Sequence, residues 1–392
     1  MLNIDQLKEY EKELISLRRH FHMHPELANE EYETAKYIEK YLHECGLEVI
    51  KGFAKTGIVG ILKGKEGPSI GIRAEMDALP INETNDVIYK SRYPYKMHAC
   101  GHDGHMAVTL VTAKILSKMK DKLNGSIVFI FQPAEENLPE GGAKRFCKEA
   151  RDILKDLKAI FGFHFWPSTE SGKVAVSKDP MMAAGDIFEV VFNGMGAHGA
   201  NPHQSSDVLL MTSASVLSLT NIVARNIRPG IQATLSVGVI EGGKSPNVLP
   251  AESIIKGTTR YLSEDLKDVF PEKIDRVLDG ISKAYSGSYK LKYSYGYPLL
   301  QNNEAMVDVV QKCAESVVGK SNLIEKIGPS LTSEDFAVFL KDIPGCHFWI
   351  GTYNPNNNLI HMLHNPQFDL DEAVMIIPVR ILLMICQQLV NS

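Results

Sequence analysis

The chain has 392 residues, of which 44% are hydrophobic and 23% are charged, and its formal net charge is −5. This length predicts two or three domains with sizeable cores, and the composition excludes a disordered or fibrous protein. The net charge argues against nucleic acid as a partner, because binding a phosphate backbone needs clustered Lys and Arg residues. We therefore expect a globular protein that acts on a small solute.

The N-terminal segment carries acidic and basic residues at helical spacing and lacks the apolar core of a secretory signal. No later stretch is long and apolar enough for us to expect a membrane span. The six cysteines are scattered without paired spacing, which is typical of proteins from a reducing compartment. These features predict a cytoplasmic protein without a membrane partner.

The first part of the chain alternates helical patterns with short apolar runs. The pattern predicts helices at about 5–23 and 30–45, strands at 58–62 and 69–74, and an apolar helix directly after the run MHACGHDGH. The run SIVFIFQP, a further helix and the run AIFGFHF follow. Helices that alternate with nearly continuous apolar strands predict an α/β fold, with a parallel or mixed sheet covered by helices on both faces.

The pattern changes over residues 185–296, where strand, helix, strand, strand, helix and strand follow one another. This order is typical of a small α+β unit, so we expect an inserted domain at 185–296. The α/β pattern resumes afterwards, with helices near 303–318 and 370–391 and a buried strand CHFWIG. The catalytic domain is accordingly predicted in two parts, 1–184 and 297–392.

The run MHACGHDGH places Cys100 and His102 just ahead of an apolar helix. Thiolate and neutral imidazole are ligands that zinc-like ions prefer, and three histidines with a cysteine in nine positions seldom gather for packing alone. A histidine-rich helix start with polar capping is the alternative. The run predicts a site for divalent metal.

Four further segments place donor side chains at the ends of predicted strands, where open α/β sheets usually carry their sites. The donors are Asp77, the adjacent pair Glu135 and Glu136, His164, and the histidines His361 and His364. Each of these signals is weak alone, because a single histidine is more often a hydrogen-bonded core residue and a pair of glutamates is usually a solvated surface feature. Their joint placement favours a common site.

Two adjacent acids at a strand end can divide the work of metal-assisted hydrolysis. One carboxylate binds the cation, and its neighbour takes a proton from the water that the cation activates. A pair of cations needs a bridging ligand, and the thiolate of Cys100 can serve because the positive end of the following helix favours its ionisation.

Nine segments occur in the order found in the binuclear-metal aminoacylase and carboxypeptidase family: RRHFHMHPEL, AEMDALP, MHACGHDGH, FQPAEE, GAHGANPH, SPNVLP, GTTR, TSEDF and MLHNPQFDLDE. The chain resembles this family over nearly its whole length. It is most similar to the amidohydrolase subgroup, which includes hippurate hydrolases, N-acyl-amino-acid deacylases and auxin-conjugate hydrolases. Two departures are Glu75, where the subgroup usually has Asp, and GAHG in place of GGHG.

The resemblance implies a role for each matching residue. Cys100 would bridge two metal ions, with His102 and Glu136 on one ion and His164 and His364 on the other. Glu135 would be the general acid and base, and Asp77 would orient a metal ligand. In the inserted domain, expected to be a lid and dimerisation domain, His198 would stabilise the oxyanion, and Asn247 and Arg260 would bind the carboxylate of the substrate.

The resemblance thus implies hydrolysis of the amide bond of N-acyl amino acids by a dimer or larger homo-oligomer with two divalent ions per subunit. Ligand softness favours zinc, while manganese, cobalt and nickel remain open. One alternative is a metallocarboxypeptidase that acts on short peptides. Another, from a different class, is a non-catalytic metal-binding or thiol-sensing module.

Overall fold

The computed structural model describes residues 4–391, which divide into two compact units. The smaller unit comprises Met182–Leu300 together with Pro329–Glu334, and the larger unit comprises the other described residues. The predicted insertion, 185–296, lies within the smaller unit. The return of the chain to this unit was not predicted. It follows from backbone pairing, because the amide of Ala183 donates to the carbonyl oxygens of Ser330 and Thr332 at 3.0 and 2.9 Å.

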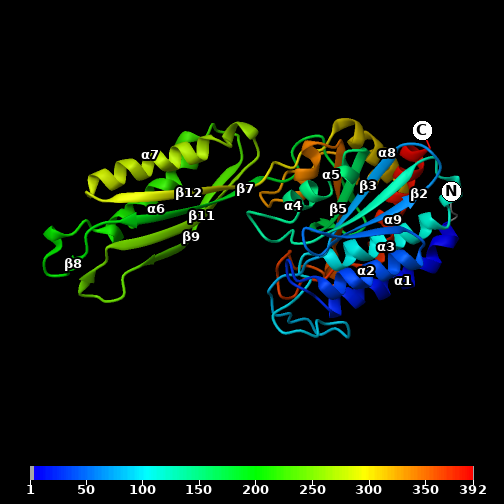
Figure 1. Cartoon of the computed structure of the whole chain (residues 1–392), viewed down its shortest axis with the longest axis horizontal. Helices are drawn as coiled ribbons and strands as arrows, with labels where there is room; N and C mark the ends of the chain where they lie inside the picture. Colours follow the sequence, from blue (N-terminus) through cyan, green and yellow to red (C-terminus); the bar gives the residue numbers. More distant parts are fainter. Residues whose placement is uncertain (1–3, 392) are drawn as a thin grey trace. The chain divides into compact units, whose positions relative to one another are not determined.

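The larger unit is built on an eight-stranded mixed sheet (Figure 1). Its central strands are parallel to one another, whereas the β1–β2 and β2–β4 pairs are antiparallel. In spatial order the strands are β1 (Glu48–Phe53), β2 (Gly57–Lys63), β4 (Ser126–Gln132), β3 (Ser69–Glu75), β5 (Leu157–Glu170), β14 (Gly345–Tyr353), β6 (Val174–Ala175) and β13 (Leu323–Ile324).

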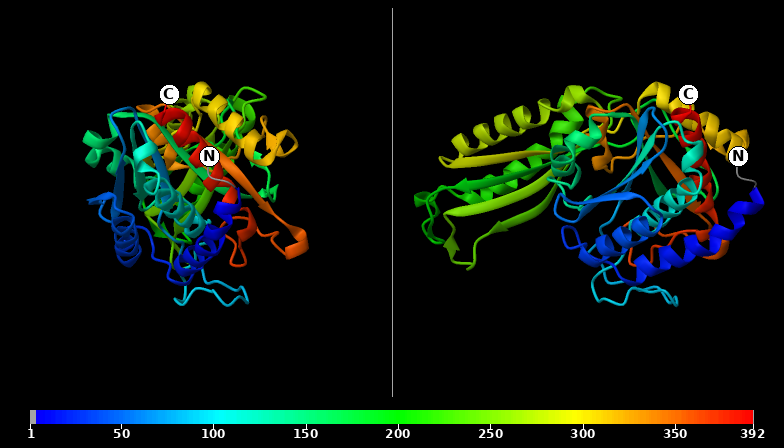
Figure 2. Two further views of the ribbon diagram at one scale, coloured as in Figure 1. Left: turned by 90° about the vertical axis from the view of Figure 1, so that its right-hand side faces the viewer. Right: turned by 45° about the vertical axis from the view of Figure 1, so that its right-hand side comes forward.

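Helices cover both faces of this sheet, as the alternating pattern predicted. On one face, Ile72, Phe129 and Phe161 share a core with α1, α2, α3, α8 and α9. On the other face, Phe146 of α4 and Phe336 of a short 3-10 helix pack against glycines of the strands. Figure 2 shows α9, in red, beside α1 and α3. The helices are α1 (Ile4–Met23), α2 (Tyr32–Glu44), α3 (His102–Ser117), α4 (Ala143–Glu149), α5 (Arg151–Leu154), α8 (Glu304–Val318), α9 (Ile376–Val390) and the 3-10 helix Asp335–Lys341.

The smaller unit has a four-stranded antiparallel sheet with two helices on one face (Figure 1). Residues of β7 are alternately buried and half-buried, because every second side chain faces the helices. The strands, in spatial order, are β12 (Ser288–Tyr297), β7 (Ala184–Asn193), β11 (Glu252–Tyr261) and β9 (Ala233–Gly242), and the helices are α6 (Val208–Asn226) and α7 (Val269–Ala284). A separate ladder joins β8 (Ala197–His198) to β10 (Val248–Leu249).

By length and composition alone, two stretches could cross a membrane. The expectation that no stretch would be long and apolar enough is therefore wrong on this criterion. The two stretches are Val208–Asn226 and Glu372–Val390. Such stretches also occur as core helices of globular units, and α9 fits that description: its side chains Val379, Leu382 and Ile385 are fully buried in the core of the larger unit. All six cysteines lie within residues 4–391 and are free.

Candidate metal centre and active site

Cys100 and His102 lie where the chain enters α3. Gly101, between them, has a φ of +84°, in the left-handed region that glycine adopts without steric cost. Both flanking side chains are buried. They lie at the positive end of the helix dipole, which favours anionic groups such as a thiolate.

Hydrogen bonds to main-chain oxygens fix the tautomers of two buried histidines. The Nδ1 of His102 donates to the carbonyl oxygen of Asp77 at 2.8 Å, and the Nδ1 of His164 donates to that of Phe165 at 2.7 Å. Because a carbonyl oxygen only accepts, the neutral form of each ring has its lone pair on Nε2. The Nε2 of His164 lies 3.4 Å from the Sγ of Cys100, and the buried Nε2 of His102 has no hydrogen-bond partner among the described residues. In the neutral form of the rings, both nitrogens can bind a cation.

Asp77 holds the two adjacent glutamates through their backbone. Its carboxylate oxygens accept the amide protons of Glu135 at 3.1 Å and of Glu136 at 3.0 Å. Since Asp77 follows β3 and the glutamates follow β4, the parallel pairing of these strands brings the residues together. The carboxylate of Asp77 also lies 3.5 Å from the Nδ1 of His102, so one acid organises three candidate site residues.

Glu31 supports the same turn and was not predicted as a site residue. Ala134 precedes the acid pair with a φ of +57°, and its amide donates to the carboxylate of Glu31 at 2.9 Å. The hydroxyl of Thr56 donates to the other oxygen of Glu31 at 2.7 Å. Burial and the charge of Asp77 raise the pKa of Glu31 to about 7. The sequence feature that could have pointed to Glu31 is the acidic pair Glu30 and Glu31, which lies close to the RRHFHMHPEL segment.

The raised pKa of Glu31 predicts a pH-dependent stability of the metal-free protein. A carboxyl group whose pKa is higher in the folded than in the unfolded protein stabilises the fold at pH values below the unfolded-state pKa. This stabilisation is lost as the pH rises from the unfolded-state pKa to the folded-state pKa. As the pH rises from about 4.5 to 7, the free energy of unfolding of the wild type should fall by up to roughly 3 kcal/mol relative to that of Glu31→Gln. Urea denaturation of both metal-free proteins across this range measures the difference, and parallel pH profiles would contradict it.

His364 lies on a loop, and its side chain is 51% exposed. Its Nε2 is 3.1 Å from a carboxylate oxygen of Glu136, and its amide donates to the carbonyl oxygen of Ala99 at 2.8 Å. Its φ of +65° is uncommon for a residue with a side chain. The contact with Ala99 ties the loop to the segment that carries Cys100.

The five candidate ligands fall into overlapping donor groups, two of which share Cys100. One group contains Cys100, His102 and His164, and the other contains Cys100, Glu136 and His364; the donor atoms within each group lie within 4.8 Å of one another. A third group contains His102, Glu135 and Glu136 within the same distance, so the predicted pairing of His102 with Glu136 on one ion and of His164 with His364 on the other stays a prediction. His102 and His164 come from α3 and β5, while Glu136 and His364 come from loops.

The chemistry of this donor set fits a pair of divalent cations. Burial and the charges of Glu136 and Glu135 raise the pKa of the Cys100 thiol well above its usual value. Burial lowers the pKa of His102, but its bond to Asp77 and the nearby carboxylates raise it, to about 10 on balance. The thiol and the imidazole therefore keep their protons without metal, and a bound cation would displace these protons and balance the charge of the carboxylates.

Further buried ion pairs lie next to the candidate ligands. Glu75 accepts from the Nδ1 of His105 at 2.8 Å and pairs with Arg73, which also binds Asp335 at 2.5 Å. Charges from Arg73 and His105 outweigh burial and hold the pKa of Glu75 well below its usual value. Glu75 can therefore stay ionised in the interior and fix the ring of His105, which packs against His164.

The predicted substrate residues all lie in the smaller unit, but at two different places. The β8–β10 ladder pairs His198 with Val248, so His198 and Asn247 lie next to each other, and both are exposed. Arg260 lies near the other end of β11, opposite Gly185, where its guanidinium contacts Ser333. From Glu252 to Arg260 the strand rises about 3.3 Å per residue, or roughly 26 Å. The structure thus does not bring Arg260 together with His198 and Asn247 within one unit.

Comparison with known proteins decides the family. The model of peptidase family M20/M25/M40 matches residues 71–387, which include all five candidate metal ligands. The chain belongs to this M20 family. It is 38% identical to an N-acetyl-L-cysteine deacetylase from Bacillus subtilis, over 94% of this chain and 86% of the relative. It is 36% identical to thermostable carboxypeptidase 2 from Saccharolobus solfataricus, over 95% and 94% of the two chains.

The structural comparison agrees. A dinuclear metal-binding peptidase of the M20 family from Bacillus subtilis superposes with a TM-score of 0.82 at 32% identity, covering 98% of this chain and 99% of the other. Membership in the M20 family confirms the predicted resemblance and α/β fold. The protein is a metal-binding hydrolase of amide or peptide bonds with the dinuclear peptidase fold.

Proposed function

We propose that this M20 hydrolase cleaves the amide bond of N-acyl amino acids and releases the free amino acid. The observation that carries the proposal is the arrangement around Cys100. Two donor groups share this thiol, and the buried carboxylate of Glu135 lies within 4.8 Å of donor atoms of His102 and Glu136. An acid that close to the ligands, held by its own backbone amide, is placed for proton transfer.

We propose zinc as the metal, because thiolate and imidazole ligands suit its softness. Cys100, His102 and His164 would hold one ion, and Cys100, Glu136 and His364 the other. When bound, such ions lower the pKa of water and polarise the carbonyl of the scissile amide. Glu135 then accepts the proton of the attacking water and donates it to the leaving nitrogen, while Asp77 keeps its backbone in place.

The free carboxylate of the substrate would bind to Arg260, whose planar guanidinium matches a carboxylate. We expect Arg260→Ala to lower kcat/KM for N-acyl amino acids by about 10- to 100-fold, since charged hydrogen bonds contribute roughly 1.5–3 kcal/mol. The corresponding amino acid amides, which lack the carboxylate, serve as the control. Their kcat/KM should not change, and an equal loss for both substrates would contradict this role.

We further propose that the active enzyme is a homodimer in which His198 and Asn247 serve the partner's catalytic centre. The separation of Arg260 from His198 within the smaller unit supports this, because one small substrate cannot reach both ends of β11. The exposed edge strand β9 and the helix α6 next to it offer apolar side chains for association; these are Leu210, Leu217, Val239 and Ile240.

A panel of substrates tests the proposed reaction. Purified protein loaded with zinc, manganese, cobalt or nickel is assayed on N-acetyl and N-benzoyl amino acids and on dipeptides. Preference for the N-acyl amino acids supports the proposal, whereas preference for dipeptides would favour a metallocarboxypeptidase. Absence of hydrolysis with every metal would favour a non-catalytic module, although Glu135 and Asp77 would then have no evident use.

A further inference from the structure

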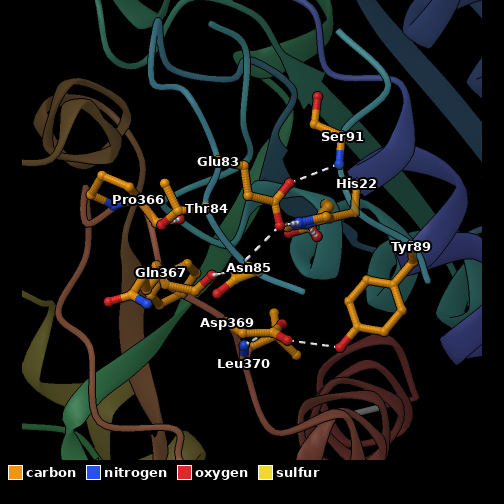
Figure 3. A network of polar contacts seen from close by, with 12 residues as sticks. His22, Glu83, Thr84, Asn85, Tyr89, Ser91, Pro366, Gln367, Asp369 and Leu370 are labelled. Atoms are coloured by element: carbon orange, nitrogen blue, oxygen red, sulfur yellow. Dashed lines mark hydrogen bonds and ion pairs between the residues drawn. The ribbon is translucent and has the colours of Figure 1, made fainter. Parts of the chain in front are cut away.

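The loop that carries His364 faces a second long loop, and neither contains a helix or strand. Residues 80–96 and 360–371 are both irregular in the structure. No ladder of backbone hydrogen bonds can hold such segments, so side chains and single backbone contacts must fix their positions. Long irregular segments inside a compact unit are usually functional. Figure 3 shows the polar contacts that join the two.

Four hydrogen bonds run from the first loop to the second, and two of them come from Thr84, whose hydroxyl donates to the carbonyl oxygen of Pro366 at 3.3 Å. The amide of Thr84 donates to the carbonyl oxygen of Pro366 at 2.9 Å. The side-chain amide of Asn85 donates to the carbonyl oxygen of Phe368, also at 2.9 Å. The hydroxyl of Tyr89 donates to the carboxylate of Asp369 at 2.7 Å (Figure 3). These contacts fix the segment that begins two residues after His364.

The first loop is itself anchored by a buried acid. Glu83, only 4% exposed, accepts the amide proton of Ser91 at 2.7 Å, which closes the loop on itself. Its other oxygen lies 3.2 Å from the Nε2 of His22 and from the side-chain amide of Asn85 (Figure 3). The Nδ1 of His22 lies 2.7 Å from the carboxylate of Asp103, the residue after His102.

Arg18 joins the two ligand-bearing segments directly. Its fully buried guanidinium binds Asp103 at 2.8 Å and Asp369 at 2.5 Å. Asp103 lies in the first turn of α3, next to His102, and Asp369 follows His364 by five positions. Arg18 and His22 belong to the RRHFHMHPEL segment, for which the sequence predicted no role of its own in the site.

His364 needs such support more than the other candidate ligands do. Its side chain is half exposed and its backbone is in the left-handed region, so local sequence alone does not hold it in place. His102 and His164, in contrast, are buried and start or lie within regular elements. A shift of the 364–369 segment would move one ligand and leave the buried pair unchanged.

We infer that Asn85, Tyr89 and Arg18 are positioning residues that hold His364 in place and so set the affinity of one of the two metal sites. The inference rests on the proposed ligand role of His364. Partners that orient metal ligands typically contribute about 10- to 100-fold to metal affinity. The site formed by Cys100, Glu136 and His364 should therefore depend on the loop, and the site formed by Cys100, His102 and His164 should not.

The test uses the double variant Asn85→Leu/Tyr89→Phe, which removes two of the four contacts at half-buried positions, together with the bond from Asn85 to Glu83, and keeps the charged side chains Arg18, Glu83 and Asp369. Metal-free protein is titrated with zinc in competition with a chromophoric chelator, and its thermal midpoint is measured without metal. We expect one zinc dissociation constant to rise by about 10- to 100-fold, with the other and the midpoint of the metal-free protein unchanged. Tyr95→Phe is the matched control, because Tyr95 is an exposed tyrosine of the same loop outside this network.

The outcomes separate the inference from the proposed function. Two zinc ions bound by the wild type, with unchanged constants in the double variant, would overturn the inference alone. Equal weakening of both sites together with a lower thermal midpoint of the metal-free protein would also overturn it, since the loop would then serve only general stability. Fewer than two zinc ions in the wild type would contradict the proposed function itself, and with it the basis of the inference.

Discussion

Glu135→Gln is expected to lower kcat by about 10²- to 10⁴-fold while the protein keeps both metal ions. Glutamine has nearly the same shape as glutamate, and the bond to Asp77 uses the backbone amide of residue 135, so the substitution leaves the turn intact. What it removes is the carboxylate that accepts and returns the proton. Steady-state kinetics and metal analysis of the same preparation measure both quantities.

Glu136→Gln is the matched control for this variant. The same chemical change one residue away alters a candidate ligand whose carboxylate lies 3.1 Å from His364, so it should lower metal content. Glu135→Gln should leave the metal content unchanged. If Glu135→Gln retains full turnover, Glu135 is not the general base, and if it loses metal as Glu136→Gln does, the two acids do not divide the work as proposed.

Mixing two inactive variants, His198→Ala and Glu135→Gln, is expected to restore activity. If His198 serves the partner's centre, a mixed dimer contains one centre with both native residues and one with neither. Random exchange of equal amounts makes half of the dimers mixed, which gives about one quarter of the wild-type activity. Turnover of an N-acyl amino acid is measured before and after exchange.

Subunit exchange must be demonstrated independently, for example with two tags of different mass. The double variant His198→Ala/Glu135→Gln, mixed with wild type, controls for dilution, because its mixed dimers contain no newly completed centre. Exchange without recovery would confine His198 to its own chain or remove it from the reaction. It would also leave the separation of His198 from Arg260 along β11 without a functional explanation.

The sequence was sufficient where a residue's position follows from a regular element. The runs SIVFIFQP and AIFGFHF are buried strands, so their periodicity predicted β4 and part of β5, and with them the places of Glu135 and His164. The edge strand β1 was missed, because none of its residues is buried and its pattern lacks a continuous apolar run. Residues 329–334 return to the smaller unit through the backbone pairing with Ala183 and the contact of Ser333 with Arg260, and no sequence pattern marks these contacts.

The candidate site was predictable as a list of residues rather than as an arrangement. Glu31 contacts Ala134 across 103 positions, and nothing local in the sequence marks that contact. The candidate ligands fall into donor groups that overlap at Cys100, His102 and Glu136, and which residues share a group depends on the elements that lie beside Cys100. The distance between Arg260 and His198 likewise becomes visible only when β11 is seen as one extended strand.

The most direct test of the binuclear centre is a crystal structure of the zinc-loaded protein with anomalous diffraction recorded at the zinc edge. We predict two peaks about 3.5–4 Å apart, with the Sγ of Cys100 a ligand of both. One peak should have His102 and His164 as ligands, and the other Glu136 and His364. A single peak, or peaks bound by residues other than these five, would contradict the account.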